Sequence, residues 1–360
     1  MSGTARRRHP RRLLVTGGAG FIGTNFVRLV LAENQDLQIF NLDALTYAGN
    51  PANLADLEEL YPGRHHFLQA DLRDREAVAR AFARAEPDTV INFAAESHVD
   101  RSIDNPLLFV ETNVLGTAAL LETARRTWRE RRDVRFHHVS TDEVFGSLGK
   151  EGQFREDTPY SPSSPYSASK AGADHLVRAW GRTYGLPVSL SNCSNNYGPW
   201  QFPEKLIPLT LANALEEKPL PIYGRGENVR DWLHVEDHVR AIWLIITRGS
   251  EGASYNVGGG NEWTNLDLAR LLCSRLDVLR PRSAGPYADL IAFVPDRPGH
   301  DLRYAIDGSR LRKELGWRPA YDFASGLDHT INWYLEHQDW MRDIRSRKYA
   351  GGRLGRLGNG

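Results

Sequence analysis

The sequence is poor in cysteine: Cys193 and Cys273 are the only two among 360 residues. These two form no disulfide framework and have no zinc-ligand spacing, which favours a reducing, cytoplasmic setting. An export signal is not expected either. Arg11-Arg12 precede the apolar residues Leu13-Leu14-Val15, but that run leads at once into a glycine-rich turn.

The sequence also lacks an excess of charge and a long apolar run. Lys and Arg number 45, as do Asp and Glu, so no overall field attracts the chain to nucleic acid or to a membrane surface. The longest apolar candidate, Ala241 to Thr247, is much shorter than the roughly 18 residues of a membrane helix. We therefore expect no nucleic-acid or membrane partner, and any anionic ligand must be bound by local charge.

Short apolar segments alternate with helix-length segments through the first half of the chain, which is typical of βαβ units and a doubly wound parallel α/β sheet of the Rossmann type. Beyond about Val188 the alternation loosens at joints rich in Pro and Gly, which indicates a smaller substrate-binding lobe. We expect residues 12–187 to form the dinucleotide-binding domain and 188–341 mainly the lobe, with flexible basic ends at 1–11 and 342–360. The expected strands are Leu13–Thr16, Leu37–Leu42, His66–Gln69, Thr89–Ala95 and Phe136–Val139; the expected helices are Gly23–Glu33, Arg75–Ala85 and Leu107–Arg126.

A glycine-rich turn follows the first expected strand and opens a helix. Gly18-Ala19-Gly20-Phe21-Ile22-Gly23 has the G-x-G-x-x-G spacing that lets a pyrophosphate approach the backbone at a helix N-terminus. Asp43 closes the next strand about 20 residues later, where a carboxylate can bind a ribose 2′-hydroxyl and would repel a 2′-phosphate. The pattern predicts NAD rather than NADP. A glycine turn and a strand-end Asp with no ligand are the alternative; Asp71, at the end of the third strand, fits an adenine contact more weakly.

Two further patterns carry candidate chemistry. Tyr166 and Lys170 stand four residues apart on one helix face, so that the ammonium can lower the phenol pKa and yield a usable base. Asp142 and Glu143 follow the fifth strand, at the edge where open α/β sheets bind ligands. Either pattern alone also suits an ordinary helix surface or a turn.

With the glycine-rich turn, the Tyr–Lys pair resembles the extended short-chain dehydrogenase/reductase family. Further stretches are similar to its dTDP-glucose 4,6-dehydratase subgroup, and the similarity spans about Leu13 to Tyr334. These stretches are Thr46–Asn50, Ala94–Ser102, Asn195–Pro199, Phe202–Lys205, Arg230–Trp232 and Asp296–Asp301.

The resemblance implies a division of catalytic roles. Tyr166 would take the proton of the C4 hydroxyl, with Thr141 and Lys170 holding and polarising the site. Glu143 would remove the C5 proton, and Asp142 would protonate the departing C6 hydroxyl. NAD would accept hydride from C4 and return it to C6, so that dTDP-glucose becomes dTDP-4-keto-6-deoxyglucose.

The resemblance also implies binding residues, with Arg230 the expected diphosphate clamp. The cofactor set is Gly17, Gly20, Phe21, Ile22, Gly23, Asp43, Leu45, Thr46, Asp71, Leu72, Ala94, Ala95, Ser97, Thr112, Tyr166, Lys170 and Asn196. The substrate set is Ser97, Thr141, Asn195, Glu204, Lys205, Pro221, Tyr223, Arg230, Asn265, Arg297, His300 and Tyr304. Without the resemblance, Arg230 and Asp231 could be a surface ion pair.

The sequence departs from the subgroup at Trp200-Gln201, where many members have an aromatic residue followed by His. We expect this position near the sugar or base, so nucleotide specificity is what it puts in question. No metal is expected, because His234 and His238 match no zincin spacing and look like the start of an ordinary helix.

Two other functions compete with the dehydratase. A UDP-hexose 4-epimerase shares the turn and the Tyr–Lys pair but needs no elimination acids. An NAD-sensing regulatory protein would need no catalytic Thr141, Tyr166 and Lys170, and the chain has no basic stripe for nucleic acid.

Relatives in this family commonly pair two long helices of each subunit into a four-helix bundle. The corresponding segments here are Leu107–Arg126 and Ser167–Tyr184, and we expect a homodimer with Ala118, Leu121, Ala173 and Leu176 on the contact faces. The alternative is that these faces only cover the sheet within one subunit.

Overall fold

The computed structural model describes residues 7–347, and the remainder of the two expected basic ends lies outside this range. Two of its segments differ from the expected flexible ends. The last helix continues to Arg347, and Arg8 donates hydrogen bonds to the carbonyls of Asp133 and Val134. The described parts of both ends therefore pack against the body of the molecule.

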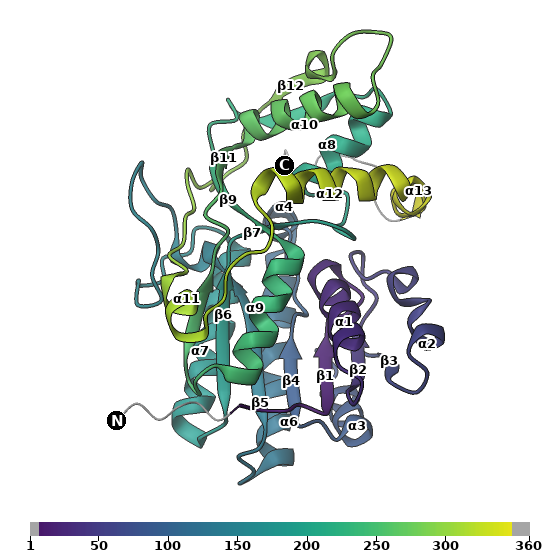
Figure 1. Ribbon diagram of the computed structural model, residues 1–360. Helices are drawn as coiled ribbons and strands as arrows, with labels where there is room; N and C mark the ends of the chain where they lie inside the picture. The colour runs from purple at the N-terminus through teal and green to yellow at the C-terminus, as the bar shows by residue number, and fades with distance from the viewer. Residues whose placement is uncertain (1–6, 348–360) are drawn as a thin grey trace.

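A seven-stranded sheet forms the centre of the molecule (Figure 1), and each of its strand pairs is parallel. Its order is β10-β6-β5-β4-β1-β2-β3, with the chain reversing direction across the sheet between β1 and β4. Both faces are covered by helices, so the strands are buried almost throughout, as parallel sheets require. The strands are β1 (Arg12–Thr16), β2 (Gln38–Asp43), β3 (His65–Gln69), β4 (Thr89–Asn92), β5 (Arg135–Thr141), β6 (Val188–Cys193) and β10 (Ser254–Val257).

Two helical layers enclose this sheet. One face carries α1 and α9, which contribute Phe26, Val30, Val239 and Ile242 to a single apolar cluster. The other face carries α3, α6 and α7, whose apolar residues pack with Phe136 and Trp128. These helices are α1 (Phe21–Glu33), α3 (Arg75–Ala85), α6 (Thr117–Trp128), α7 (Pro165–Tyr184) and α9 (Val235–Arg248).

The helix expected over Leu107–Arg126 is longer and less regular than predicted. It runs from Pro106 to Trp128 as α5 (Pro106–Phe109), a π-helical segment η2 (Val110–Gly116) and α6. By length and composition it could cross a membrane, contrary to our reading of the apolar runs. The segment contains no long run free of polar residues, but its mean hydropathy over an 18-residue window is that of an apolar helix. Here 44% of that window is buried inside the protein, and a core helix passes the same test.

The second lobe lies at one end of the central sheet (Figure 1). Its strands form a three-stranded sheet, β11-β9-β7, and a parallel pair, β12-β8. Its apolar cluster joins α8, α10 and α12 through Leu211, Leu272 and Leu327. The lobe contains β7 (Asn195–Tyr197), β8 (Leu220–Tyr223), β9 (Val229–His234), β11 (Glu262–Thr264), β12 (Ile291–Val294), α8 (Leu206–Leu215), α10 (Asn265–Leu279), α12 (Phe323–Glu336) and α13 (Gln338–Arg347).

The expected division near residue 188 does not follow the layers of the fold. β6, β10 and α9 come after it in the chain yet belong to the central sheet and its helical cover. The looser pattern of this half arises because the chain passes repeatedly between sheet and lobe. Short elements complete the fold: η1 (Pro51–Leu54), α2 (Leu57–Leu60), α4 (Val99–Asp104), η3 (Asp142–Phe145), η4 (Tyr287–Leu290) and α11 (Ser309–Leu315).

Candidate active site

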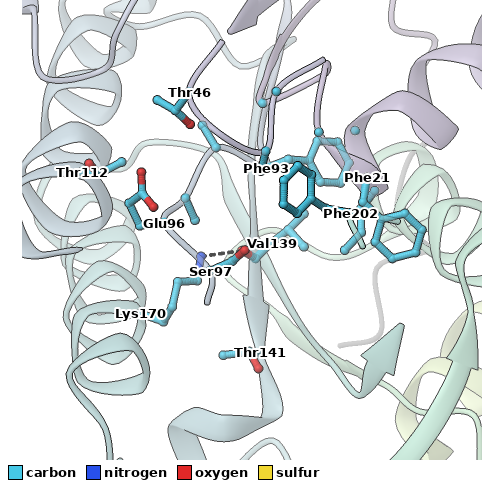
Figure 2. Close-up of a pocket in the computed structure, with 18 of the residues that line it drawn as sticks. Phe21, Thr46, Phe93, Glu96, Ser97, Thr112, Val139, Thr141, Lys170 and Phe202 are labelled. Carbon is cyan, nitrogen blue, oxygen red and sulfur yellow. Dashed lines mark hydrogen bonds between the residues drawn. The ribbon is translucent and has the colours of Figure 1, made fainter. Parts of the chain in front are cut away.

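A pocket runs along the carboxyl ends of β1, β2, β4 and β5 and continues to the lobe. Figure 2 shows Thr46, Glu96 and Thr112 on one side of it, and Phe21 with Phe202 on the other. This is the edge at which open parallel sheets bind ligands. The pocket therefore brings the predicted cofactor and catalytic residues together.

The glycine-rich turn forms one wall of the pocket. Gly17 has φ +72°, a left-handed conformation that favours glycine, and it lies directly after β1. A Cβ on Gly23 would lie 2.2 Å from the Gly17 carbonyl oxygen, so the turn closes only with glycine there. Gly20 is the N-cap of α1 and supplies no side-chain acceptor. The first N–H groups of α1 are thus left for an anion, as a dinucleotide pyrophosphate would require.

Asp43 ends β2 and points back at this turn. Its carboxylate accepts hydrogen bonds from the backbone N–H groups of Ala19 (2.9 Å) and Leu45 (2.8 Å), and it also lines the pocket. The side chain therefore has a structural part that the sequence did not reveal, beside the predicted ribose contact.

All the other predicted cofactor residues except Leu45 line the pocket. Asp71 is held by a bidentate ion pair with Arg73, which lowers the pKa of its carboxyl group. The side chain of Leu45 packs on the core beneath α1 instead of lining the pocket, and its φ is +53°. The residues of the predicted set that line the pocket are Gly17, Gly20, Phe21, Ile22, Gly23, Asp43, Thr46, Asp71, Leu72, Ala94, Ala95, Ser97, Thr112, Tyr166, Lys170 and Asn196.

Tyr166 and Lys170 reach the pocket from the first turns of α7. The helix begins with Pro165 after a capping box formed by Ser164 and Ser167, which fixes where the next turn points. Lys170 donates from Nζ to the Val139 carbonyl oxygen at 2.8 Å (Figure 2). Tyr166 is 8% exposed and packs edge-on against Phe109.

Lys170 does not dominate the pKa of the Tyr166 phenol, contrary to our expectation. Burial raises the pKa of Tyr166 well above its usual value, and the nearby Glu143 raises it further, while a hydrogen bond with Thr141 opposes the shift. Helix spacing alone does not reveal burial, which is why the sequence pointed to the opposite direction.

Asp142 and Glu143 occupy the 3-10 turn η3, which Thr141 caps by accepting the Glu143 N–H at 3.2 Å. Burial raises the pKa of Asp142 well above its usual range, and the neighbouring Glu143 adds to the rise. Burial also raises the pKa of Glu143, but Arg297, Arg230 and Lys205 oppose that shift. The pair thus consists of two buried acids in different surroundings, of which Glu143 has three cations that oppose the rise of its pKa.

The predicted substrate residues fall into two groups. Ser97, Thr141, Asn195, Glu204 and Lys205 line the pocket. Pro221, Tyr223, Arg230, Asn265, Arg297, His300 and Tyr304 lie in the lobe, outside that lining, although Arg230 and Arg297 are close enough to act on Glu143.

Arg230 is buried rather than in a surface ion pair. Its guanidinium donates to the carbonyls of Val229 (2.8 Å) and Asp301 (3.0 Å) and lies over the Tyr304 ring. Asp231 instead accepts the N–H groups of Gly259 and Asn261. The diphosphate clamp at Arg230 stays a prediction, since its donors bind backbone carbonyls here.

The lobe is attached to the sheet by charged contacts that the sequence analysis missed. Asp100 of α4 accepts hydrogen bonds from Arg297 Nη1 (2.6 Å) and the Tyr223 hydroxyl (2.9 Å). Arg101 donates to Glu204 (3.1 Å), and Lys205 donates to the Ser97 carbonyl oxygen (3.0 Å). Asp100 belongs to the Ala94–Ser102 stretch, but nothing in the neighbouring sequence identified its partners about 120 and 200 residues away.

Trp200 does not line the pocket. It has φ +69° and lies in an aromatic cluster with Trp333, His337 and Trp340 of the last helices, beneath Arg28. Gln201 does line the pocket and donates to the Asn196 carbonyl oxygen at 2.9 Å. The departure at Trp200 thus concerns how α12 and α13 pack, which no local pattern in the sequence indicates.

His234 and His238 flank the start of α9 as expected of an ordinary helix. His234 is its N-cap and accepts the Glu236 N–H, and His238 contacts the Asn196 side chain at 2.8 Å. Across residues 7–347, no group of three His, Cys, Asp or Glu side chains is arranged to bind a metal ion.

The sheet, the glycine-rich turn and the Tyr–Lys pair define the class as a Rossmann-fold short-chain dehydrogenase/reductase, and the acid pair at the sheet edge narrows it. The family model for GDP-mannose 4,6 dehydratase matches residues 14–330. A probable dTDP-glucose 4,6-dehydratase of Sinorhizobium fredii is 56% identical over 351 residues, which cover 96% of this chain and 99% of the relative.

Solved structures give the same result. The chain matches a dTDP-glucose 4,6-dehydratase of Streptomyces venezuelae, with NAD bound, at a TM-score of 0.84 and 47% identity over 92% of this chain and 99% of that one. It also matches the Bacillus anthracis dTDP-glucose 4,6-dehydratase in complex with NAD, at a TM-score of 0.83 and 42% identity over 93% and 99%. The chain belongs to the nucleotide-sugar 4,6-dehydratase family, together with these dTDP-glucose 4,6-dehydratases.

Proposed function

We propose that this protein is an NAD-dependent lyase that converts dTDP-glucose to dTDP-4-keto-6-deoxyglucose. The observation that carries the proposal is the adjacent pair of acids in the pocket that also contains Tyr166: burial raises the pKa of Asp142 and of Glu143, and Arg297, Arg230 and Lys205 oppose the shift at Glu143. Elimination of water needs an acid and a base in one step. Relatives that carry out this reaction cover nearly the whole chain.

The residues of the site fit NAD. The uncapped N-terminus of α1 suits a pyrophosphate, and the Asp43 carboxylate suits a ribose bearing a free 2′-hydroxyl. Lys170, with its ammonium at the pocket wall, would hold the second ribose. When bound, NAD takes up hydride from C4 of the sugar and returns it to C6.

In the first step the chain supplies a base for the C4 hydroxyl. Tyr166 takes its proton, and Thr141 and Lys170 orient the hydroxyl and stabilise the phenolate. Burial raises the pKa of Tyr166 and a hydrogen bond with Thr141 opposes that shift; the ammonium of Lys170 would add to the opposition.

In the second step the ketone at C4 acidifies the C5 proton. Glu143 removes that proton, and Asp142 donates its own to the C6 hydroxyl, so that the C6–O bond breaks and water leaves. Glu143 then returns its proton to C5. A 4-epimerase would need neither acid, and this distinguishes the proposal from that alternative.

The same proposal includes a homodimer. Leu107, Val110 and Leu115 are exposed apolar side chains of the Pro106–Trp128 helix, here called the stripe, with exposed fractions of 71%, 43% and 51%. Tyr184, at the end of α7, is 52% exposed and its ring lies under Arg125. Of the residues first expected at the contact, Leu121 and Ala173 are instead fully buried within the subunit. The stripe, rather than those two residues, is what we assign to a second copy packing as a four-helix bundle.

A direct incubation tests the function. Purified protein with NAD is mixed separately with dTDP-, UDP-, CDP- and GDP-glucose, and the product is analysed by mass and by NMR. We expect dTDP-glucose to yield a product lighter by one water with a ketone at C4. An isomer of unchanged mass would show an epimerase instead.

The two free cysteines, both buried, suit the cytoplasmic setting that we expect for such an enzyme.

A further inference from the structure

A buried carboxylate lies behind the catalytic lysine. Asp174 stands one helical turn after Lys170 on α7, and its side chain is 0% exposed. Its Oδ2 accepts hydrogen bonds from the hydroxyls of Ser140 and Tyr160, both at 2.8 Å. A carboxylate removed from water is destabilising unless it is paired, so its presence here calls for a cation.

His138 of β5 connects this carboxylate to Lys170. Its Nε2 lies 3.4 Å from Asp174 Oδ1 and 3.3 Å from Lys170 Nζ, and its Nδ1 lies 3.1 Å from the Asn92 side-chain nitrogen. The imidazole is 1% exposed, and burial lowers its pKa well below the usual value. Its Nε2 faces both groups, so it can donate to Asp174 or accept from Lys170, one at a time. The three side chains form one buried row from the pocket wall into the core.

Lys170 itself has no direct carboxylate partner. Its one short hydrogen bond is to a carbonyl oxygen, and within residues 7–347 it forms no ion pair. Burial lowers the pKa of its ammonium, and Asp174 is the strongest opposing group. The positive charge of Lys170 is thus balanced by Asp174, which lies beyond the His138 imidazole on the side away from the pocket.

We propose that Asp174 and His138 are positioning residues that hold Lys170 in its charged form and aim its ammonium at the pocket. Neither side chain lines the pocket, and both act through Lys170. The inference rests on the proposed function, because it assigns the ammonium a part in C4 oxidation.

Other titratable and charged groups face this row and do not replace Asp174. Tyr166 and Cys193 lie near Lys170 at the pocket, and burial raises the pKa of both. His137 adjoins His138 in the sheet. Arg178 approaches Asp174 from the surface side, where it donates to the Tyr160 hydroxyl at 2.7 Å. Burial raises the pKa of Asp174 itself, and Lys170 together with the Ser140 and Tyr160 hydroxyls opposes that shift. Among these groups Asp174 is the acid that acts most strongly on Lys170.

A purely structural role is the competing explanation, because the same contacts tie β5, β6 and α7 together. The pH dependence of C4 oxidation separates the two. Asp174→Asn keeps the size of the side chain and removes its charge. We expect the alkaline limb of C4 oxidation to move to lower pH by about one unit or more, since a neighbouring charge commonly shifts a pKa by 1 to 3 units.

The measurement uses the appearance of reduced-cofactor absorbance in single turnovers of the full-length enzyme with NAD and dTDP-glucose. All variants carry Glu143→Gln, so the reaction stops before Asp142 is used and its titration does not enter. Lys170→Arg, whose charge does not titrate, is the matched background: adding Asp174→Asn there should leave the position of the limb unchanged. Asp157→Asn, an exposed carboxylate on the adjoining surface, should not move the limb in either background.

Tyr160→Phe tests the idea even if Asp174→Asn does not fold. Loss of one hydrogen-bond donor makes the carboxylate easier to protonate, so the acid limb should move to higher pH. A rate lowered equally at every pH, with both limbs in place, would show a structural role and overturn the proposal. A wild type that removes no water would instead refute the proposed function.

Discussion

The catalytic edge of the sheet and the substrate lobe are built in different ways. Thr141, Asp142 and Glu143 follow one another at the end of β5, and Tyr166 and Lys170 stand one turn apart on α7. The lobe side is assembled from distant segments, such as the ends of β8 and β9 and the loop after β12. The proposed chemistry is therefore encoded locally, whereas the proposed substrate contacts depend on long-range packing.

The two regions meet through a short list of charged contacts centred on α4. Asp100 and Arg101 there hold Arg297 and Glu204, and the lobe cations in turn lie near Glu143. Changes at the sheet edge should therefore alter rate constants, while changes in the lobe and at α4 should alter substrate affinity first.

The largest effect should come from the sheet edge. Tyr166→Phe removes the base for the C4 hydroxyl, and we expect kcat to fall by about 10⁴, the upper end of the range for general bases. Binding of dTDP, measured by calorimetry, should stay within about twofold. A large loss of dTDP affinity would show that the two regions are not separable.

Asp142→Asn should reduce dehydration by about 10² to 10³, because the amide cannot protonate the leaving hydroxyl. C4 oxidation should persist, since Tyr166 is untouched. The check is a single turnover followed by both absorbance and product mass; unimpaired loss of water would remove Asp142 from the mechanism.

The pH dependence of dehydration should reflect the raised pKa of Glu143. A base must be ionised, so activity should be lost as pH falls through a value above the ordinary glutamate pKa of 4.5. Arg297 keeps the pKa of Glu143 from rising further. Arg297→Gln should therefore raise that pKa and move the acid limb of the pH profile to higher pH. A limb that stays in place would mean that another group sets it.

Asp100→Asn probes the junction between the regions. With the charge of its partner gone, Arg297 loses a 2.6 Å hydrogen bond between charged groups. We expect KM for dTDP-glucose to rise about tenfold, just below the 1.5 to 3 kcal/mol typical of such bonds because the amide oxygen can still accept, with kcat changed less than threefold. Asp267→Asn, an exposed carboxylate of the lobe, is the control. A fall confined to kcat would assign Asp100 to the chemistry instead.

The smallest effect should be on cofactor choice. Asp43→Asn keeps an acceptor for the turn but removes the charge that repels a 2′-phosphate, so the preference for NAD over NADP should narrow by about tenfold or less. Binding of both cofactors by fluorescence checks this. Equal affinity of the wild type for NAD and NADP would contradict the argument from the charge of Asp43.

The sequence predicted the fold and which residues meet at the edge of the sheet, because both are local signals. The βαβ alternation located the first five strands, and the Tyr–Lys spacing placed both side chains on one face of α7. The later strand β10 escaped assignment because the chain reaches it only after excursions into the lobe, whereas β6 follows α7 directly and begins at the expected boundary near Val188. The π-helical η2 was missed for another reason: its hydrophobic spacing does not differ from that of an α-helix over so few residues.

Side-chain environment was the least predictable part. Burial reverses the expected direction of the Tyr166 pKa, and it places His138 and Asp174 behind Lys170. Asp174 did carry a signal, since it continues the Tyr166–Lys170 face by one more turn. His138 carried none, because its partners come from α7 and β4.

The central claim is that the acid pair performs an elimination separate from C4 oxidation, and Glu143→Gln tests it most directly. The amide can hydrogen-bond but cannot accept the C5 proton, and loss of a positioned base lowers a rate by about 10² to 10⁴. In a single turnover with dTDP-glucose, reduced-cofactor absorbance should appear and persist, while no water is lost from the sugar. Dehydration at the wild-type rate, or a trace as silent as that of Tyr166→Phe, would contradict the account.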